Sequence, residues 1–189
     1  SIQRPSHIAR GTGVFGPDGR GACSECGVSD QVPLRVGTLS KALGSVGGFV
    51  AGSREVIDHV INTARPWMFS TALPPACVAA AREALRIVEA EPERREKARR
   101  YGRELAEKMA ERGLEVPRVT GPIVPVILGE PERAAAAARR LEQTGFLVPA
   151  IRPPTVPGGT SRLRISLSAA HSDDQVAGLA RVLVTAATK

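Results

Sequence analysis

Lys41 lies in a segment made mostly of small residues, GTLSKALGSVGG at positions 37–48. Glycine and other small side chains let another molecule approach the backbone closely. If the lysine is partly buried there, its charged form is costly, and the neutral amine that can form a Schiff base with an aldehyde becomes available. Thr38 and Ser40 add hydroxyls that could hold an anionic phosphate or orient the lysine. An exposed lysine in a glycine-rich hairpin is the structural alternative, and the segment does not match the P-loop pattern.

A second group of polar residues precedes a proline pair. Ser70 and Thr71 stand just before Pro74 and Pro75, and proline is tolerated in the first turn of a helix. The free N–H groups of a helix N-terminus, together with nearby hydroxyls, can bind an anion. Ordinary capping of the same helix is an equally supported alternative.

A third pattern is the alternation at positions 162–168. Successive residues of a strand point to opposite faces, so the leucine and isoleucine residues of this segment are expected to face the core. The opposite face would carry Arg162, Arg164, Ser166 and Ser168. An arginine held on a strand suits bidentate recognition of a carboxylate. The alternative is a polar outer face whose charge protects a sheet edge.

The elements around these residues follow from periodicity and from turn and cap signals. Short strands are predicted at 32–36 and 48–51, after a turn-rich loop at 11–31. Ser53 is expected to cap a helix that begins at Arg54. A buried strand is predicted at 67–70, followed by a helix from the proline pair to about Ala90.

A second set of elements is predicted after a long charged helix that begins at Pro92 and ends at Gly113. The expected strands are 122–129, 146–151 and 162–168, with a helix at 130–145 between the first two. Ser172 and Gln175 match a capping box for a last helix.

Composition limits the classes of partner. The 189 residues carry a net charge of +7, but the charges are scattered and aromatic residues are few, so nucleic acid is not a predicted partner. Cys23 and Cys26 form an isolated C-x-x-C without a second ligand pair, so we predict reduced cysteines and no metal site. No apolar stretch approaches the roughly 20 residues that span a bilayer. A cytoplasmic protein without a membrane partner is therefore expected.

Five stretches in one order resemble the α-oxoamine synthase family of fold-type I pyridoxal-phosphate enzymes. They are GTGVFGPDGRGA (11–22), GTLSKALGSVGGFVAGS (37–53), ARPWMFSTALPP (64–75), PIVPVILG (122–129) and IRPPTVPGGTSRLRISLSAAH (151–171). The resemblance implies an α/β fold, the C-terminal part of such a transferase. Its expected parts are a partial large domain with the Schiff-base lysine (1–91), a connecting helix (92–112) and a small C-terminal α+β domain (113–189).

The resemblance also implies a reaction and roles for residues. FSTALPP and RPPTVPGGTSRLR are most similar to the biotin-pathway branch, in which L-alanine condenses with a pimeloyl thioester of CoA or carrier protein and loses carbon dioxide. Lys41 matches the lysine that holds pyridoxal 5'-phosphate, and Thr38 and Ser40 lie beside the cofactor. Thr155 and Arg164 match substrate-contacting residues, and the arginine binds the amino-acid carboxylate. Ser70 and Thr71 match a pair that reaches the cofactor phosphate of the other subunit in a homodimer.

The match is incomplete at the start of the chain. The family has D-E-A-H before G-T-G-V, where its aspartate keeps the cofactor nitrogen protonated, but His7 and Arg10 occupy the outer positions of that motif here. The family's N-terminal half also has no counterpart. We therefore expect this chain to be inactive by itself. Another α-oxoamine synthase of the glycine C-acetyltransferase type, or a non-catalytic remnant that dimerises, is the alternative.

Overall fold

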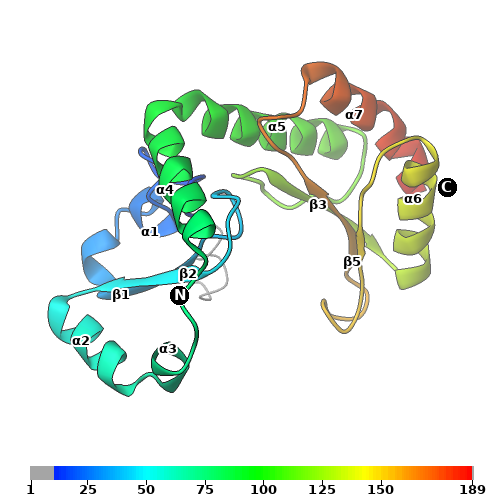
Figure 1. Cartoon of the computed structure of the whole chain (residues 1–189). Helices are drawn as coiled ribbons and strands as arrows, with labels where there is room; N and C mark the ends of the chain where they lie inside the picture. Colours follow the sequence, from blue (N-terminus) through cyan, green and yellow to red (C-terminus); the bar gives the residue numbers. More distant parts are fainter. Residues whose placement is uncertain (1–10, 189) are drawn as a thin grey trace. The chain divides into compact units, whose positions relative to one another are not determined.

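The computed structural model describes residues 11–188, which form two compact units with a border between Arg95 and Glu96 (Figure 1). The fold is α/β. Each unit has its own small antiparallel sheet, with two strands in the first unit and three in the second. Among the described residues, no helix has both the length and the apolar character needed to cross a membrane.

The first unit is built around a β-ribbon. Strands β1 (Leu34–Thr38) and β2 (Gly48–Gly52) pair antiparallel, with Thr38 opposite Gly48 at the end where the ribbon turns. The ribbon is preceded by α1 (Ala22–Glu25) and the 3-10 turn η2 (Ser29–Gln31), which lie in the segment predicted to be a loop. It is followed by α2 (Arg54–Thr63), α3 (Arg65–Met68) and α4 (Pro75–Ala90). The predicted cap of α2 is confirmed, because the Ser53 hydroxyl accepts the Val56 N–H at 3.4 Å.

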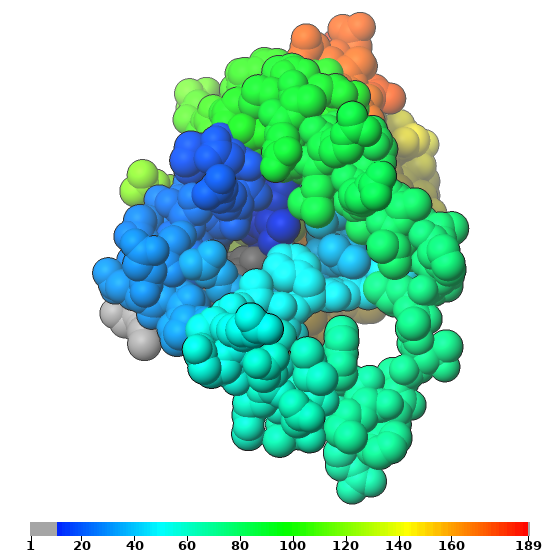
Figure 2. Space-filling model, turned by 60° about the vertical axis from the view of Figure 1, so that its left-hand side comes forward, coloured from blue at the N-terminus to red at the C-terminus, as the bar shows by residue number. Residues whose placement is uncertain are grey.

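The first unit buries little apolar surface. Its buried hydrophobic residues, among those described, are Cys23, Leu43 and Ala81. Every residue of β2 is exposed, and the space-filling view shows the cyan-to-green segment that holds α2 and α3 at the surface (Figure 2). Large apolar side chains remain exposed on the ribbon and the helices, namely Leu34, Val36, Val46, Phe49, Val50, Ile61, Trp67, Met68, Phe69, Val78 and Leu85. A two-stranded ribbon is marginally stable unless other elements cover it, and here the described residues leave much of it open.

The strand predicted at 67–70 is wrong. The segment Arg65–Met68 is the short helix α3, with Pro66 in its first turn, where its missing N–H costs nothing. The Met68 N–H donates to the Ala64 carbonyl at 3.1 Å, as helical backbone does. Trp67 is 66% exposed instead of buried. A short apolar run such as Trp67–Phe69 does not distinguish a strand from a helical turn, and Pro66 was the signal that favoured the helix.

The second unit has a three-stranded sheet in the order β3-β5-β4, formed by Ile123–Gly129, Ser161–Ser166 and Ala150–Ile151. Helices α6 (Pro131–Gln143) and α7 (Asp173–Thr188) complete it, with α5 (Pro92–Glu111), which crosses the border between the units. Its core holds the most deeply buried side chains of the structure, which include Tyr101, Leu105, Met109, Val124, Val126, Leu141, Leu163 and Leu183. This unit therefore has the apolar core that the first unit lacks.

Several boundaries in the second unit follow the predicted signals. Helix α5 ends in a Schellman motif, in which the Gly113 N–H reaches the Ala110 carbonyl and the Leu114 N–H reaches Met109. The capping box of α7 is confirmed by reciprocal bonds between Ser172 and Gln175, at 2.9 and 3.2 Å. The strand predicted at 146–151 is shortened to two residues. Pro149 accepts the Arg164 N–H but has no N–H of its own, so the ladder stops there.

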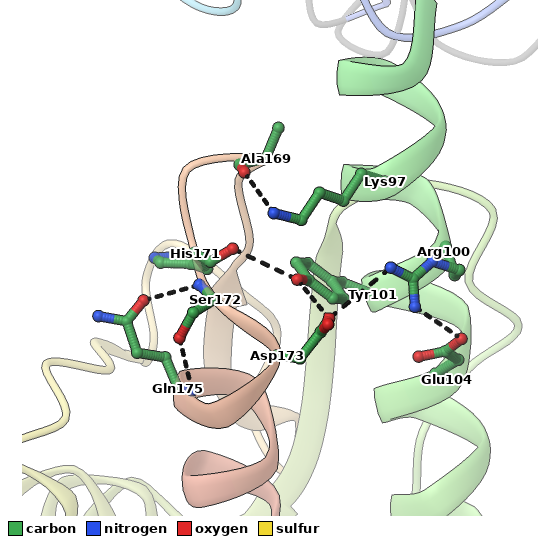
Figure 3. A network of polar contacts seen from close by, with 9 residues as sticks. All are labelled: Lys97, Arg100, Tyr101, Glu104, Ala169, His171, Ser172, Asp173 and Gln175. Atoms are coloured by element: carbon green, nitrogen blue, oxygen red, sulfur yellow. Dashed lines mark hydrogen bonds and ion pairs between the residues drawn. The ribbon is translucent and has the colours of Figure 1, made fainter.

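A polar network joins α5 to the turn between β5 and α7 (Figure 3). The buried Tyr101 hydroxyl donates to Asp173 Oδ1 at 2.6 Å and lies 3.3 Å from the His171 carbonyl. Lys97 Nζ donates to the Ala169 carbonyl at 3.0 Å, and Arg100 lies 3.7 Å from Asp173 Oδ1. These contacts hold residues 169–173, which follow the end of β5 at Ser166. Helix α5 therefore fixes the position of the chain where it leaves this strand.

We predict that this network makes stability depend on pH at both ends of the scale. The hydrogen bond from Tyr101, with help from the Arg100 charge, lowers the pKa of Asp173, and the same bond raises the pKa of Tyr101. The contribution of Asp173 is therefore present above the unfolded carboxyl pKa and is lost as pH falls through the folded value. The contribution of Tyr101 is present below the unfolded phenol pKa and is lost as pH rises through the folded value.

Asp173→Asn should therefore lower the melting temperature at neutral pH and flatten its dependence on pH in the acid range. Tyr101→Phe should flatten the pH dependence of the melting temperature in both the acid and the alkaline range. Thermal unfolding followed by circular dichroism across pH tests this, with Asp174→Asn as the matched control in the same helical turn. Acid slopes that are equal in the native protein and in Asp173→Asn would contradict the assignment.

Candidate functional site

The lysine segment is a loop that closes the β1–β2 ribbon. The Leu39 N–H donates to the Gly47 carbonyl at 2.9 Å, and the Ser45 N–H donates back to the Leu39 carbonyl at 2.9 Å. A tighter turn is nested inside, where the Gly44 N–H reaches the Lys41 carbonyl at 3.0 Å. Lys41 therefore stands at the tip of a hydrogen-bonded hairpin, as the structural alternative from the sequence describes.

Three polar side chains meet at this tip. Lys41 Nζ donates to Ser40 Oγ at 3.1 Å, and Ser40 Oγ lies 2.7 Å from Thr38 Oγ1. The Thr38 hydroxyl also accepts the Ser40 N–H at 3.1 Å and reaches the Gly47 carbonyl at 3.3 Å. The structure thus brings Thr38, Ser40 and Lys41 together. Lys41 is exposed among the described residues, so the burial that would favour its neutral form is not provided by this part of the chain.

The loop is fastened to α4 by residues that the sequence analysis did not single out. The Ser45 hydroxyl donates to the Cys77 carbonyl at 2.7 Å, 32 positions along the chain. Gly47 has a positive φ of 102°, and a Cβ there would lie 2.7 Å from Leu73 Cδ1. Neither contact has a local sequence signal, because each depends on how the hairpin packs on the helix.

Ser70 and Thr71 lie in the connection between α3 and α4, and both are exposed. They do not cap α4, since the helix has Pro74 at its N-cap position and no side-chain cap bond. The capping alternative is therefore wrong. The Pro74 carbonyl accepts the Cys77 N–H at 2.9 Å, which begins the helical hydrogen bonding. The hydroxyls of Ser70 and Thr71 remain accessible.

In the second unit, Arg164 projects from the middle of β5. The residues of β5 alternate as expected, with Leu163 and Ile165 buried and Arg162 and Arg164 half-buried on the other face. The Nε of Arg164 is buried without a hydrogen-bond partner. A buried donor without a partner costs free energy. This arginine is therefore suited to donate hydrogen bonds to an anion such as a carboxylate.

Thr155 belongs to the exposed loop between β4 and β5. Its N–H donates to the Arg152 carbonyl at 3.0 Å. The substrate-contacting roles that the resemblance implies for Thr155 and Arg164 both stay predictions. His7 and Arg10 lie outside the described residues.

The rest of the described chain offers no metal centre. Residues 11–188 contain no group of three or more histidine, cysteine, aspartate or glutamate side chains placed to hold a metal ion. Cys23, Cys26 and Cys77 are all free thiols.

Comparison with known proteins gives consistent relatives. The family model described as aminotransferase class I and II matches residues 9–183. An 8-amino-7-oxononanoate synthase from Methylococcus capsulatus is 50% identical over 179 residues, which are 94% of this chain and 46% of the relative. One from Anaeromyxobacter dehalogenans is 49% identical over 93% of this chain and 44% of the relative.

Solved structures show the same fold. A serine palmitoyltransferase from S. paucimobilis with a bound PLP–myriocin aldimine matches with a TM-score of 0.89 and 33% identity, covering 95% of this chain and 46% of the other. An 8-amino-7-oxononanoate synthase from Francisella tularensis matches with a TM-score of 0.83 and 27% identity, and the match covers 94% of this chain and 52% of the other. The chain thus spans about half the length of the relatives that it matches.

We predict that the contact between Gly47 and Leu73 fixes the lysine hairpin. Gly47→Ala should open the loop, because a Cβ would meet Leu73 in addition to the cost of about 1 kcal/mol for a positive φ. Gly44→Ala is the matched control, since its φ is also positive but nothing lies within 4 Å of the added carbon. Hydrogen exchange of the Leu39 amide reports the opening. Equal exchange rates in the two variants would contradict the role of the Leu73 contact.

Proposed function

Because the chain belongs to the aminotransferase class I and II family, we propose that it is the lysine-bearing part of a pyridoxal-phosphate acyltransferase. The proposed reaction is that of 8-amino-7-oxononanoate synthase in biotin synthesis. In it, L-alanine condenses with pimeloyl-CoA or a pimeloyl carrier protein and loses carbon dioxide. The observation that carries this choice is the 50% identity, over nearly the whole chain, to a relative of that name.

The residues of the hairpin tip are suited to the cofactor. Lys41 would hold pyridoxal 5'-phosphate through the aldehyde of the cofactor, because the lysine amine is accessible and is oriented by Ser40. The hydroxyls of Thr38 and Ser40 can donate to an anionic oxygen of the cofactor, and their mutual bond keeps them in place. When bound, the cofactor supplies an electron sink for negative charge at the α-carbon of the amino acid.

Arg164 is proposed to bind the carboxylate of the incoming amino acid. Its guanidinium is half-buried on a rigid strand, and its unpartnered Nε can form one arm of a bidentate contact. Thr155 is proposed as a second contact to the substrate, from the exposed loop before β5. Holding the amino acid by its carboxylate limits its rotation, which favours one orientation for removal of the α-proton and for attack on the thioester.

Ser70 and Thr71 are proposed to serve the other subunit of a homodimer. Their hydroxyls are exposed and unused by α4, so they can reach an anion outside this chain. Trp67, Met68 and Phe69 lie directly before them and are 52–75% exposed. Exposed aromatic residues beside polar ones are typical of protein interfaces. The cytoplasmic location expected from the sequence stays a prediction.

The proposed activity belongs to a protein of the relatives' full length. The apolar side chains that the first unit leaves exposed support this, because a ribbon with few buried residues gives the lysine little support. The 189 residues by themselves are expected neither to hold the cofactor tightly nor to turn over. A non-catalytic chain that only dimerises, and a synthase that prefers glycine and acetyl-CoA, are the alternatives that the experiments below address.

We predict that cofactor binding depends on Lys41 and on completion of the chain. The 189 residues alone should show no imine absorbance with pyridoxal phosphate. The chain completed by the N-terminal half of a relative should show the band, and borohydride reduction should fix the label on the peptide that contains Lys41. Lys41→Ala should abolish the band, whereas Lys108→Ala, an exposed lysine of α5, should retain it. A completed protein without a Lys41-dependent band would support the non-catalytic alternative.

The role of Arg164 is tested in the same completed protein. Arg164→Gln should raise the KM for alanine roughly 10- to 150-fold, since a hydrogen bond to a charged group is worth about 1.5–3 kcal/mol. Arg162→Gln is the control on the same face of β5, because its Nε is already bonded to the Thr160 carbonyl. Steady-state kinetics with alanine and pimeloyl-CoA, and in parallel with glycine and acetyl-CoA, distinguish the branches. Equal KM values in both variants would exclude Arg164 as the carboxylate ligand.

A further inference from the structure

We propose that Cys23 and Cys26 form a reversible dithiol–disulfide couple, and that its oxidised form fastens α1 to the glycine-rich loop at 11–21. The pair plays no part in the acyltransferase chemistry described above. The proposal rests on the backbone conformation of the pair, on the unequal exposure of the two sulfurs, and on what lies between them.

The backbone places the two cysteines within reach of each other. Cys23 lies in α1, and Cys26, directly after α1, keeps helical dihedral angles of −88° and −1°. The Cys26 N–H donates to the Ala22 carbonyl at 3.0 Å, so positions 22–26 form one helical turn. Residues three apart in a helix lie on the same face, with Cα atoms about 5 Å apart. This spacing falls within the roughly 4.4–6.8 Å that a disulfide spans. The Cβ atoms of such a pair lie about 5–6 Å apart and must approach to roughly 3.5–4.5 Å. Closure therefore requires a local shift of Cys26, the last residue of the turn, toward Cys23.

The two thiols differ in access to solvent. Cys26 is exposed, whereas Cys23 is 7% exposed and belongs to the few buried residues of the first unit. Both are free in this structure. Cys26 is therefore the thiol that a dissolved oxidant meets, and Cys23 is protected from it but adjacent to Cys26. An accessible thiol beside a sheltered one is the arrangement in which a resolving cysteine acts.

The oxidation is a balanced exchange with a small disulfide such as glutathione disulfide. The Cys26 thiolate attacks one sulfur of the disulfide, which forms a mixed disulfide and releases one reduced thiol. The Cys23 thiolate then attacks the sulfur of Cys26 and releases the second thiol. Each cysteine loses one proton, the protein loses two electrons, and the small disulfide is reduced to two thiols. Excess reduced thiol reverses both steps.

The turn closed by this bond holds the glycine-rich loop. Glu25 lies between the cysteines, and its Oε2 accepts the Gly16 N–H at 2.7 Å. The Gly21 carbonyl accepts the N–H groups of Ser24 and Glu25, both at 3.1 Å. The packing is tight, because a Cβ on Gly11 would lie 2.7 Å from the Ala22 nitrogen. A disulfide that restrains this turn therefore also restrains the loop bonded to it.

Other fates of the cysteines are less well supported. Among residues 11–188, no third ligand approaches the pair to complete a metal site. Cys77 lies on α4, 51 positions from Cys26, and is partly buried. It has no cysteine partner in its own helix, so its replacement removes a third thiol without changing the pair.

The test uses the full chain with Cys77→Ser, equilibrated with mixtures of reduced and oxidised glutathione, quenched with acid and analysed by mass spectrometry. The expected product has lost the mass of two hydrogen atoms, carries no glutathione, and yields a peptide that links Cys23 to Cys26. Cys23→Ala should instead accumulate a glutathione adduct on Cys26, because nothing resolves it. Cys26→Ser should react at least tenfold more slowly. Exchange of the Gly16 amide should slow in the disulfide form and recover on reduction.

Either of two results would overturn the dithiol–disulfide couple itself. One is a glutathione adduct that persists on Cys26 while Cys23 is present, which would show that the buried thiol does not resolve it. The other is a protein whose two thiols stay reduced across the mixtures while Cys26 in Cys23→Ala also fails to react. A disulfide that forms without any change in the Gly16 amide would contradict the role in the loop.

Discussion

Apolar burial is divided unequally between the two units, and most other properties of the chain depend on this division. The second unit has a continuous core, in which Val124, Val126, Leu163 and Leu183 are fully buried. The first unit buries only small residues and Leu43 among those described. Hydrophobic burial is the main favourable term in folding. The unit that carries Lys41 therefore relies on hydrogen bonds and a few local contacts for its shape.

This division affects Arg164 and Lys41 differently. Arg164 is held by a sheet, and Tyr101 and Lys97 of α5 form hydrogen bonds to the segment that follows its strand (Figure 3). Lys41 is held by the hairpin bonds of its own loop and by Ser45, which reaches across to α4. The strand that carries Arg164, the residue proposed to bind the carboxylate, therefore has a folded core beneath it. The ribbon that carries Lys41 has every residue of β2 exposed and depends on those few hydrogen bonds.

The comparison between sequence and structure is clearest for particular elements. The end of α5 at Gly113, the capping box of Ser172 and the alternation along β5 were all predictable, because each signal lies within a few residues of the feature that it determines. The segment 67–70 was mispredicted because its apolar run fits two conformations, and its large side chains are exposed among the described residues. The strand at 146–151 was predicted too long because the effect of Pro149 depends on its pairing with Arg164.

Five stretches that resemble the family were enough to predict it from the sequence, and periodicity and cap signals predicted most of the helices and strands. Residue types and spacing also singled out Lys41 and Arg164 as candidates for chemistry. Only the tertiary structure decided that Lys41 is exposed and bonded to Ser40, that Ser45 fastens its loop, and that Ser70 and Thr71 do not cap α4. The physical reason is the range of the interactions. Caps and alternation act between neighbours in the chain, whereas exposure and anchoring depend on which distant segments pack against a residue.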